Sequence, residues 1–119
     1  ENSTFVAFGN NGTIRTSSDG TTWDNRTSGT SNNLPGGTYG NNIFVTVGDN
    51  GTILTSSDGT TWTSRTSGVT ERLRGITYGN SIFVAVGRSG TILTSSDGTT
   101  WTSRTSGTTE HFRRVAYKE

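Results

Sequence analysis

Residues 52–68, TILTSSDGTTWTSRTSG, decide the fold, because they return letter for letter at residues 91–107. Their central part is present once more at residues 17–23, SSDGTTW. Three sets of aromatic residues keep the same interval of 39 residues: Trp23, Trp62 and Trp101; Phe5, Phe44 and Phe83; Tyr39, Tyr78 and Tyr117. A fixed period of this length is typical of a repeat architecture. Such slight divergence between the copies indicates either very recent duplication or deliberate engineering.

One repeat predicts four short strands and no helix. In the last complete copy they are expected at residues 73–78, 82–86, 91–95 and 99–105, with Gly-, Asn-, Ser- and Asp-rich turns between them. Four strands in 39 residues is the content of a β-propeller blade. The predicted fold class is therefore all-β: a β-propeller with three four-stranded blades per chain. We expect one propeller-fragment domain over residues 1–119, with repeats 5–43, 44–82 and 83–119.

A seven-residue motif lies between the third and fourth predicted strand of each copy. It resembles the Asp-box of the BNR repeat family, which is found in sialidases, sortilin-like receptors and photosystem II assembly propellers. In such a turn the Asp carboxylate can accept backbone N–H groups, which we expect to be buried. Gly supplies positive φ, and the Trp ring covers the blade. We predict a structural role for Asp19, Gly20, Trp23, Asp58, Gly59, Trp62, Asp97, Gly98 and Trp101.

Composition and charge exclude several function classes. Ten basic and nine acidic residues give no reason to expect nucleic acid, and there is no apolar run long enough for a membrane span. Without cysteine there are no disulfides or thiolate metal sites, and His111 is the one histidine, so neither a metal nor a cofactor is expected. A first residue Glu1 in place of Met indicates a processed, excised or engineered product. Only the family resemblance suggests a location, an extracytoplasmic one.

The sequence predicts that the chain is not an enzyme. The resemblance implies that a sialidase would need three converging arginines, an acid and a Tyr–Glu pair. Arg26, Arg65 and Arg104 recur once per copy, but they follow the Trp on the outermost strand, far from the axis. A glycosidase needs two neighbouring carboxylates, whereas Glu71 and Glu110 occupy equivalent positions of different copies.

The copies differ mainly in one window, residues 30–36, 69–75 and 108–114. This window leads into the innermost strand of a blade, so its side chains are expected at the mouth of the central channel. One interpretation is a cationic rim that binds an anion, a peptide or a glycan; the resemblance to photosystem assembly factors implies an arginine-rich, peptide-binding face. The alternative is drift at a solvent-filled pore. The candidate binding residues are Glu71, Arg72, Arg74, Glu110, His111, Arg113 and Arg114.

The order of the strands predicts self-assembly. We expect the chain to open on the second strand of a blade, at residues 5–8, and to close on an innermost strand, at residues 112–117. Propellers typically close with roughly four to eight blades, so three blades are expected to need a partner. We predict a homodimer that forms one six-bladed ring by strand exchange, with a nine-bladed homotrimer as the alternative. The predicted function is a structural, self-assembling module; the alternative is the peptide- or glycan-binding propeller.

Overall fold

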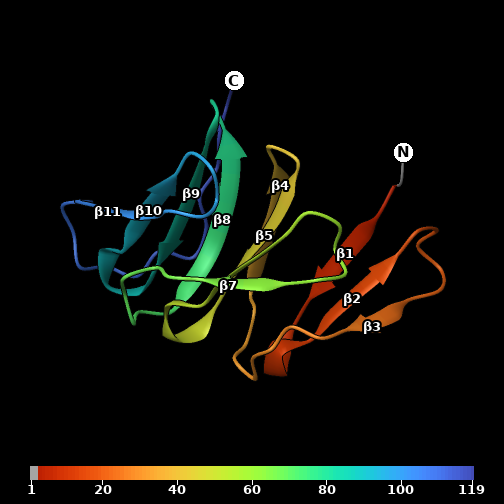
Figure 1. Cartoon of the computed structure of the whole chain (residues 1–119). Coiled ribbons are helices and arrows are strands. Elements are labelled where there is room, and N and C mark those ends of the chain that lie inside the picture. The colour runs from red at the N-terminus through yellow and green to blue at the C-terminus, as the bar shows by residue number, and fades with distance from the viewer. Residues whose placement is uncertain (1–2) are drawn as a thin grey trace.

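The structure, a computed structural model, describes residues 3–119 and consists of strands joined by turns (Figure 1). The strands are β1 (Phe5–Phe8), β2 (Ile14–Ser17), β3 (Asp24–Arg26), β4 (Gly36–Gly40), β5 (Ile43–Val47), β6 (Ile53–Ser56), β7 (Thr63–Arg65), β8 (Leu73–Gly79), β9 (Ile82–Gly87), β10 (Ile92–Ser95) and β11 (Thr102–Arg104). Three short 3-10 turns join neighbouring strands: η1 (Asn10–Gly12) joins β1 and β2, η2 (Asp49–Gly51) joins β5 and β6, and η3 (Arg88–Gly90) joins β9 and β10.

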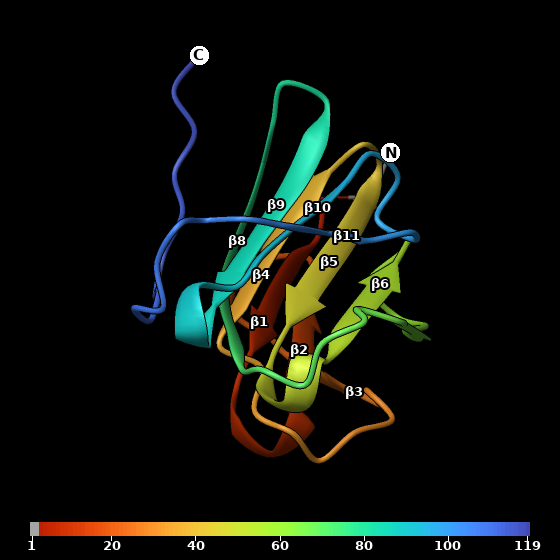
Figure 2. The ribbon, with the colours of Figure 1, turned by 90° about the vertical axis from the view of Figure 1, so that its left-hand side faces the viewer.

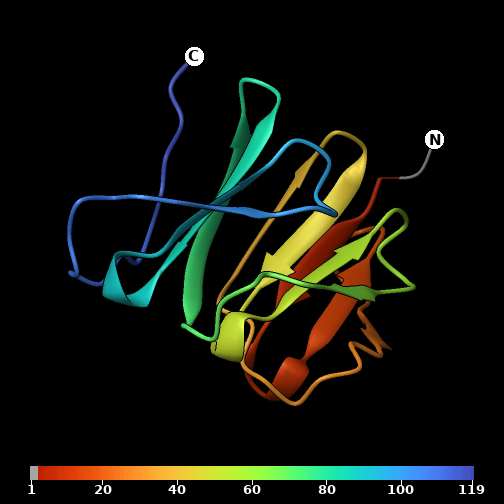
Figure 3. The ribbon, with the colours of Figure 1, turned by 60° about the vertical axis from the view of Figure 1, so that its left-hand side comes forward.

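The strands form three antiparallel sheets, in the orders β1-β2-β3, β4-β5-β6-β7 and β8-β9-β10-β11. The sheets follow one another in chain order across the molecule (Figure 3). The predicted all-β fold is confirmed, with three antiparallel sheets. The prediction of three four-stranded blades is wrong for the first sheet, which has three strands. Strand β1, which corresponds to β5 and β9, lies at the sheet edge because no innermost strand precedes it within the described residues.

The repeat fixes the strand register. Phe5, Phe44 and Phe83 each pair with the serine that opens the Asp-box turn on the neighbouring strand. The predicted strand at residues 99–105 is too long, because β11 contains only Thr102–Arg104. The residues before it still belong to the hydrogen-bonded turn, so they cannot join the ladder.

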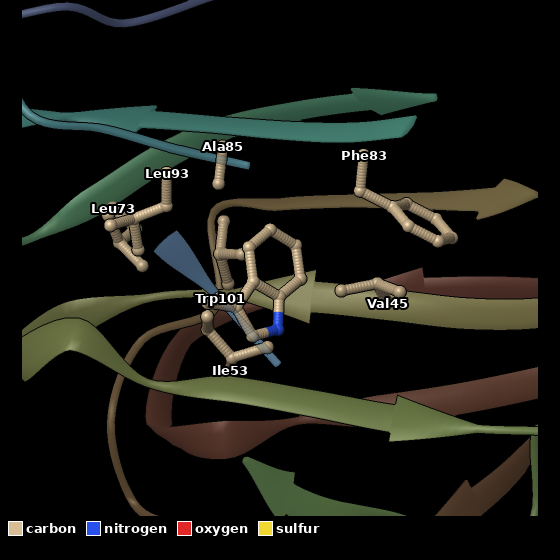
Figure 4. Close-up of a cluster of buried hydrophobic side chains, with 8 residues drawn as sticks. Val45, Ile53, Leu73, Phe83, Ala85, Leu93 and Trp101 are labelled. Atoms are coloured by element: carbon tan, nitrogen blue, oxygen red, sulfur yellow. The ribbon is translucent and has the colours of Figure 1, made fainter. Parts of the chain in front are cut away.

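The hydrophobic core lies between the faces of neighbouring sheets. One buried cluster joins the second and third sheets: Val45, Val47, Ile53, Leu73, Phe83, Ala85, Leu93 and Trp101. Figure 4 shows the Trp101 ring at its centre, between Ile53 and Val45 on one side and Leu93 and Ala85 on the other. A smaller cluster of Ile14, Leu34 and Leu54 joins the first and second sheets. Within the described residues the second sheet therefore packs against a sheet on either side, whereas the first and third sheets each pack against one, as in a stacked repeat.

The C-terminal segment, residues 112–117, continues past the third sheet in an extended conformation (Figure 2). The Phe112 N–H donates to the Gly87 carbonyl oxygen at 3.0 Å, as the Leu73 N–H donates to Gly48 at the start of β8. The segment then follows β8, with the Tyr117 ring against Gly79. The predicted strand is not formed within the described residues, because these residues pack beside β8 without a strand that pairs with them in a hydrogen-bonded ladder. Their position is nevertheless that of an innermost strand.

Candidate functional site

The turn formed by the SSDGTTW motif, at residues 17–23, 56–62 and 95–101, is held by two side chains with different surroundings. In the second copy, Asp58 Oδ1 accepts the Thr60 N–H at 2.8 Å and the Thr61 N–H at 3.1 Å. Ser56 Oγ accepts the Gly59 N–H at 2.7 Å and donates to Asp58 Oδ1. Gly59 has φ of 83°, in the left-handed region that glycine adopts without strain. In this geometry Asp58 and Gly59 shape the turn between β6 and β7, which is the role that the sequence predicts for them.

The other two turns repeat the arrangement. Equivalent hydrogen bonds are made by Ser17, Asp19 and Gly20 in the first copy and by Ser95, Asp97 and Gly98 in the third. The backbone N–H donors, together with the serine hydroxyl, hold the pKa of all three aspartates below its ordinary value. Each tryptophan Nε1–H donates to the carbonyl oxygen of the motif glycine, which fixes the ring over its own sheet.

The burial of the turn corrects one expectation from the sequence. The aspartate was expected to satisfy buried N–H groups, but Asp58, Thr60 and Thr61 are exposed. Gly59 is buried, and its N–H is satisfied by Ser56, which is only 4% exposed. The serine is therefore the buried anchor of the turn, and the aspartate organises its exposed side.

The recurring arginines of the outermost strands bind within their own sheet. Nε of Arg26, Arg65 and Arg104 donates at 2.9 Å to Oγ1 of Thr16, Thr55 and Thr94, respectively. These threonines lie on the neighbouring strand of the same sheet: β2, β6 and β10, respectively. The three arginines thus tie the outermost strand to its neighbour and do not converge on a common point.

The predicted channel mouth is built where each 3-10 turn meets the segment that leads into the next innermost strand. Here the variable side chains have partners. Arg72 Nε lies 2.8 Å from Asp49 Oδ1 of η2, and both side chains are 30% exposed. The Ser89 N–H of η3 donates to Nδ1 of His111 at 3.0 Å. Arg72 and His111 occupy equivalent positions 39 residues apart, so this position clamps the preceding turn in both copies, by different chemistry.

Positive charge gathers around Arg74 on β8. Its pKa lies below its usual value, first because it is partly removed from water and then because Arg72, Arg113 and Arg88 lie nearby. The arginine stays charged; the removal from water makes the larger contribution to the lowered pKa, and repulsion by the neighbouring arginines adds to it. A shallow hollow of about 360 Å³ lies beside it, lined by Asp49, Asn50, Thr70, Glu71, Arg72 and Arg88. An anionic group placed here would relieve the repulsion, which is the chemistry this cluster offers.

The structure brings together only some of the candidate binding residues predicted from the sequence. Arg72, Arg74 and Arg113 lie near one another, and Glu71 lines the same hollow. Glu110 and Arg114 are exposed on the C-terminal segment. Arg88 belongs to the cluster and was not predicted. The sequence did contain a signal for Arg88: the equivalent positions carry Asn10 and Asp49, so this position also varies between the copies.

Residues 3–119 contain no group of three or more His, Asp or Glu side chains close enough to hold a metal ion. The same residues form no helix long and apolar enough to cross a membrane.

Three antiparallel sheets, stacked face to face with β4, β8 and the C-terminal segment side by side, define a β-propeller-like fold. Among solved structures, the chain is similar to YCF48 bound to D1 peptide, with a TM-score of 0.72 and 22% sequence identity. The match covers 87% of this chain and 36% of the YCF48 chain, so the protein spans about a third of that propeller. No protein-family model and no curated protein matches the sequence. The comparison establishes the fold.

Proposed function

We propose that this chain is a non-catalytic, self-assembling propeller module built from Asp-box repeats of the BNR type, recently amplified or engineered. Two copies complete one six-bladed ring by strand exchange. One observation carries the proposal: the first sheet lacks an innermost strand at the edge of β1, and residues 112–117 occupy the position of an innermost strand without belonging to a sheet. The C-terminal segment of one copy supplies what the first sheet of the other lacks.

The exposed faces support the same assembly. Phe5 and Trp23 on the first sheet are 56% and 37% exposed, although their equivalents Phe83 and Trp101 are 0% and 9% exposed. At the other end of the molecule, Ile82 of the third sheet is 37% exposed. Soluble proteins avoid leaving apolar faces and strand edges open. Stacking the third sheet of one copy on the first sheet of another would repeat the contact that already joins the second and third sheets.

Ring closure limits the number of copies. A contact between two different faces generates a closed ring when the rotation closes and a filament when it does not. Two copies give six blades, within the usual range of roughly four to eight. Three copies give nine blades and remain the alternative stoichiometry.

Light scattering of purified chain at micromolar concentration tests the ring. The expected mass is twice the 12.6 kDa of one chain. Deletion of residues 112–119 should leave monomers or aggregates. The variants Val115→Pro and Ala116→Pro test the strand pairing more specifically. Neighbouring N–H groups of a strand point to opposite sides, and proline removes the N–H at its own position. At least one of the two variants should dissociate the oligomer, and a well-folded monomeric parent would refute the ring.

A second candidate function is binding of a peptide or glycan at the cationic mouth. The mutual repulsion around Arg74 supports it, and YCF48, which has a similar fold, is solved with D1 peptide. A peptide and glycan array probed at low salt tests this candidate, since charge-driven binding is strongest there. Retention of acidic peptides or sulfated glycans that salt abolishes would support it, and an array without retained members would refute it.

A further inference from the structure

Four glycines of the innermost strands allow the next innermost strand to approach closely. A methyl group on Gly36 of β4 would lie 2.9 Å from the Arg74 carbonyl oxygen of β8, and one on Gly75 of β8 would lie 2.8 Å from the Arg113 carbonyl oxygen. A methyl group on Gly40 would overlap the ring of Tyr78, and one on Gly79 the ring of Tyr117. Both internal junctions between innermost strands therefore require glycine at two fixed places.

The last strand does not have these glycines. With the 39-residue interval, Gly36 and Gly75 correspond to Arg114, and Gly40 and Gly79 correspond to Lys118. Both side chains are exposed in the single chain. The mismatch has no consequence until another innermost strand comes to lie beside residues 112–118.

In the proposed ring that neighbour is β4 of the second copy. Tyr39 of β4 is 54% exposed and contacts Phe44 on one side, with ring centroids 4.7 Å apart. Its equivalents Tyr78 and Tyr117 pack on Gly40 and Gly79. Tyr39 therefore lacks its glycine partner, and the residue that would reach this place from a second copy is Lys118.

We propose that Arg114 and Lys118 hold the junction between chains apart, so that it is wider and weaker than the junctions within a chain. The inference rests on the proposed ring. At the internal spacing the Arg114 Cβ would collide with the backbone beside Pro35 of the next copy, and the Lys118 Cβ with the Tyr39 ring. Extra carbon atoms in a tight contact displace backbone and side chains and weaken it. These two residues thus set the affinity of the assembly without contributing to the fold of one chain.

The double variant Arg114→Gly/Lys118→Gly tests this, with Arg114→Ala/Lys118→Ala as the matched control. Both variants remove the same two charges, but the alanine pair keeps the Cβ atoms. The glycine pair should lower the dissociation constant of the oligomer about tenfold or more relative to the alanine pair, measured by sedimentation velocity over a dilution series. Glycine costs more chain entropy than alanine in an ordered strand, so tightening must come from the relieved contact.

The outcomes separate this inference from the proposed function. An oligomeric parent with equal dissociation constants for both variants overturns the wide junction and leaves the ring standing. A monomeric parent whose glycine variant assembles supports the wide junction and refutes the ring for the parent chain. If the parent and both double variants are all monomeric, the wide junction and the ring are both refuted.

Discussion

The equivalent tryptophans Trp23 and Trp101 should respond differently to the same substitution. Trp101 is 9% exposed at the centre of the core between the second and third sheets, and Trp23 is 37% exposed on the open face of the first sheet. A tryptophan buries about 150–250 Å², so the difference in exposure corresponds to about 40–70 Å². At about 25 cal/mol per Å², this area contributes about 1–2 kcal/mol.

Truncation of a core tryptophan to alanine costs about 3–5 kcal/mol. Trp101→Ala should therefore lower the free energy of unfolding by that amount in urea titrations of dilute, monomeric protein. Trp23→Ala should cost about 1–2 kcal/mol less. Trp62→Ala, at a half-buried ring, should fall between them. Equal losses for Trp23 and Trp101 in dilute protein would refute the argument that the neighbouring sheet decides the contribution of the ring.

The Trp23→Ala variant also separates the contribution of this ring to folding from its contribution to assembly. In the proposed ring, Trp23 is covered by the third sheet of the other copy, as Trp101 is covered by the second sheet of its own chain. Trp23→Ala should therefore raise the dissociation constant of the oligomer while leaving most of the monomer's stability intact. An unchanged dissociation constant would argue against contact between the first and third sheets of different copies.

Three further predictions concern the Asp-box and the channel mouth. Ser56→Ala should lower the free energy of unfolding by about 1–3 kcal/mol in urea titrations, because it leaves the buried Gly59 N–H without an acceptor. Asp58→Ala should lower it by less, because the N–H groups that donate to Asp58 face water. Because the pKa of Asp58 is depressed in the folded state, its stabilising contribution is complete above about pH 4 and is lost as the pH falls through that lower pKa. Asp58→Asn should therefore flatten the acid end of the profile of thermal stability against pH. An unchanged profile would contradict this. If an anionic ligand binds, charge reversal at Arg74 and Arg113 should weaken its binding in fluorescence titrations and reduce the salt dependence of that binding. Charge reversal at Arg65 and Arg104 should weaken binding much less. Equal effects of the two pairs would place the ligand on the outermost strands.

The turns could be predicted because their interactions are local. Each aspartate or serine acceptor lies within three residues of its donors. Such bonds depend on residue type and spacing alone, so the sequence was sufficient to assign roles to Asp58 and Gly59. The burial of those donors depends on the sheets before and after them, and there the expectation about Asp58 was wrong.

The candidate site was less predictable, because its contacts join residues far apart in the chain. His111 reaches Ser89, and Arg72 reaches Asp49, more than twenty residues earlier. The variation between copies pointed to the window containing Arg72 and His111, but not to the turn that they clamp. Arg88 was missed for this reason, since it lies in a hairpin turn that sequence patterns assign only to chain reversal.

The two identical segments, residues 52–68 and 91–107, show which properties a repeat carries with it. Their Asp-box hydrogen bonds agree, with 2.7 Å from the glycine N–H to the serine and 2.8 Å from the first threonine N–H to the aspartate in each. Burial does not agree: Ile53 is fully buried while Ile92 is half-buried, because another sheet follows the first segment and none follows the second. Sequence identity therefore reproduces the shape of a blade but not its stabilisation, which each blade obtains from its neighbours. A chain of such blades retains an unsatisfied face at each end, and a ring is the arrangement in which every copy of the repeat reaches the same environment.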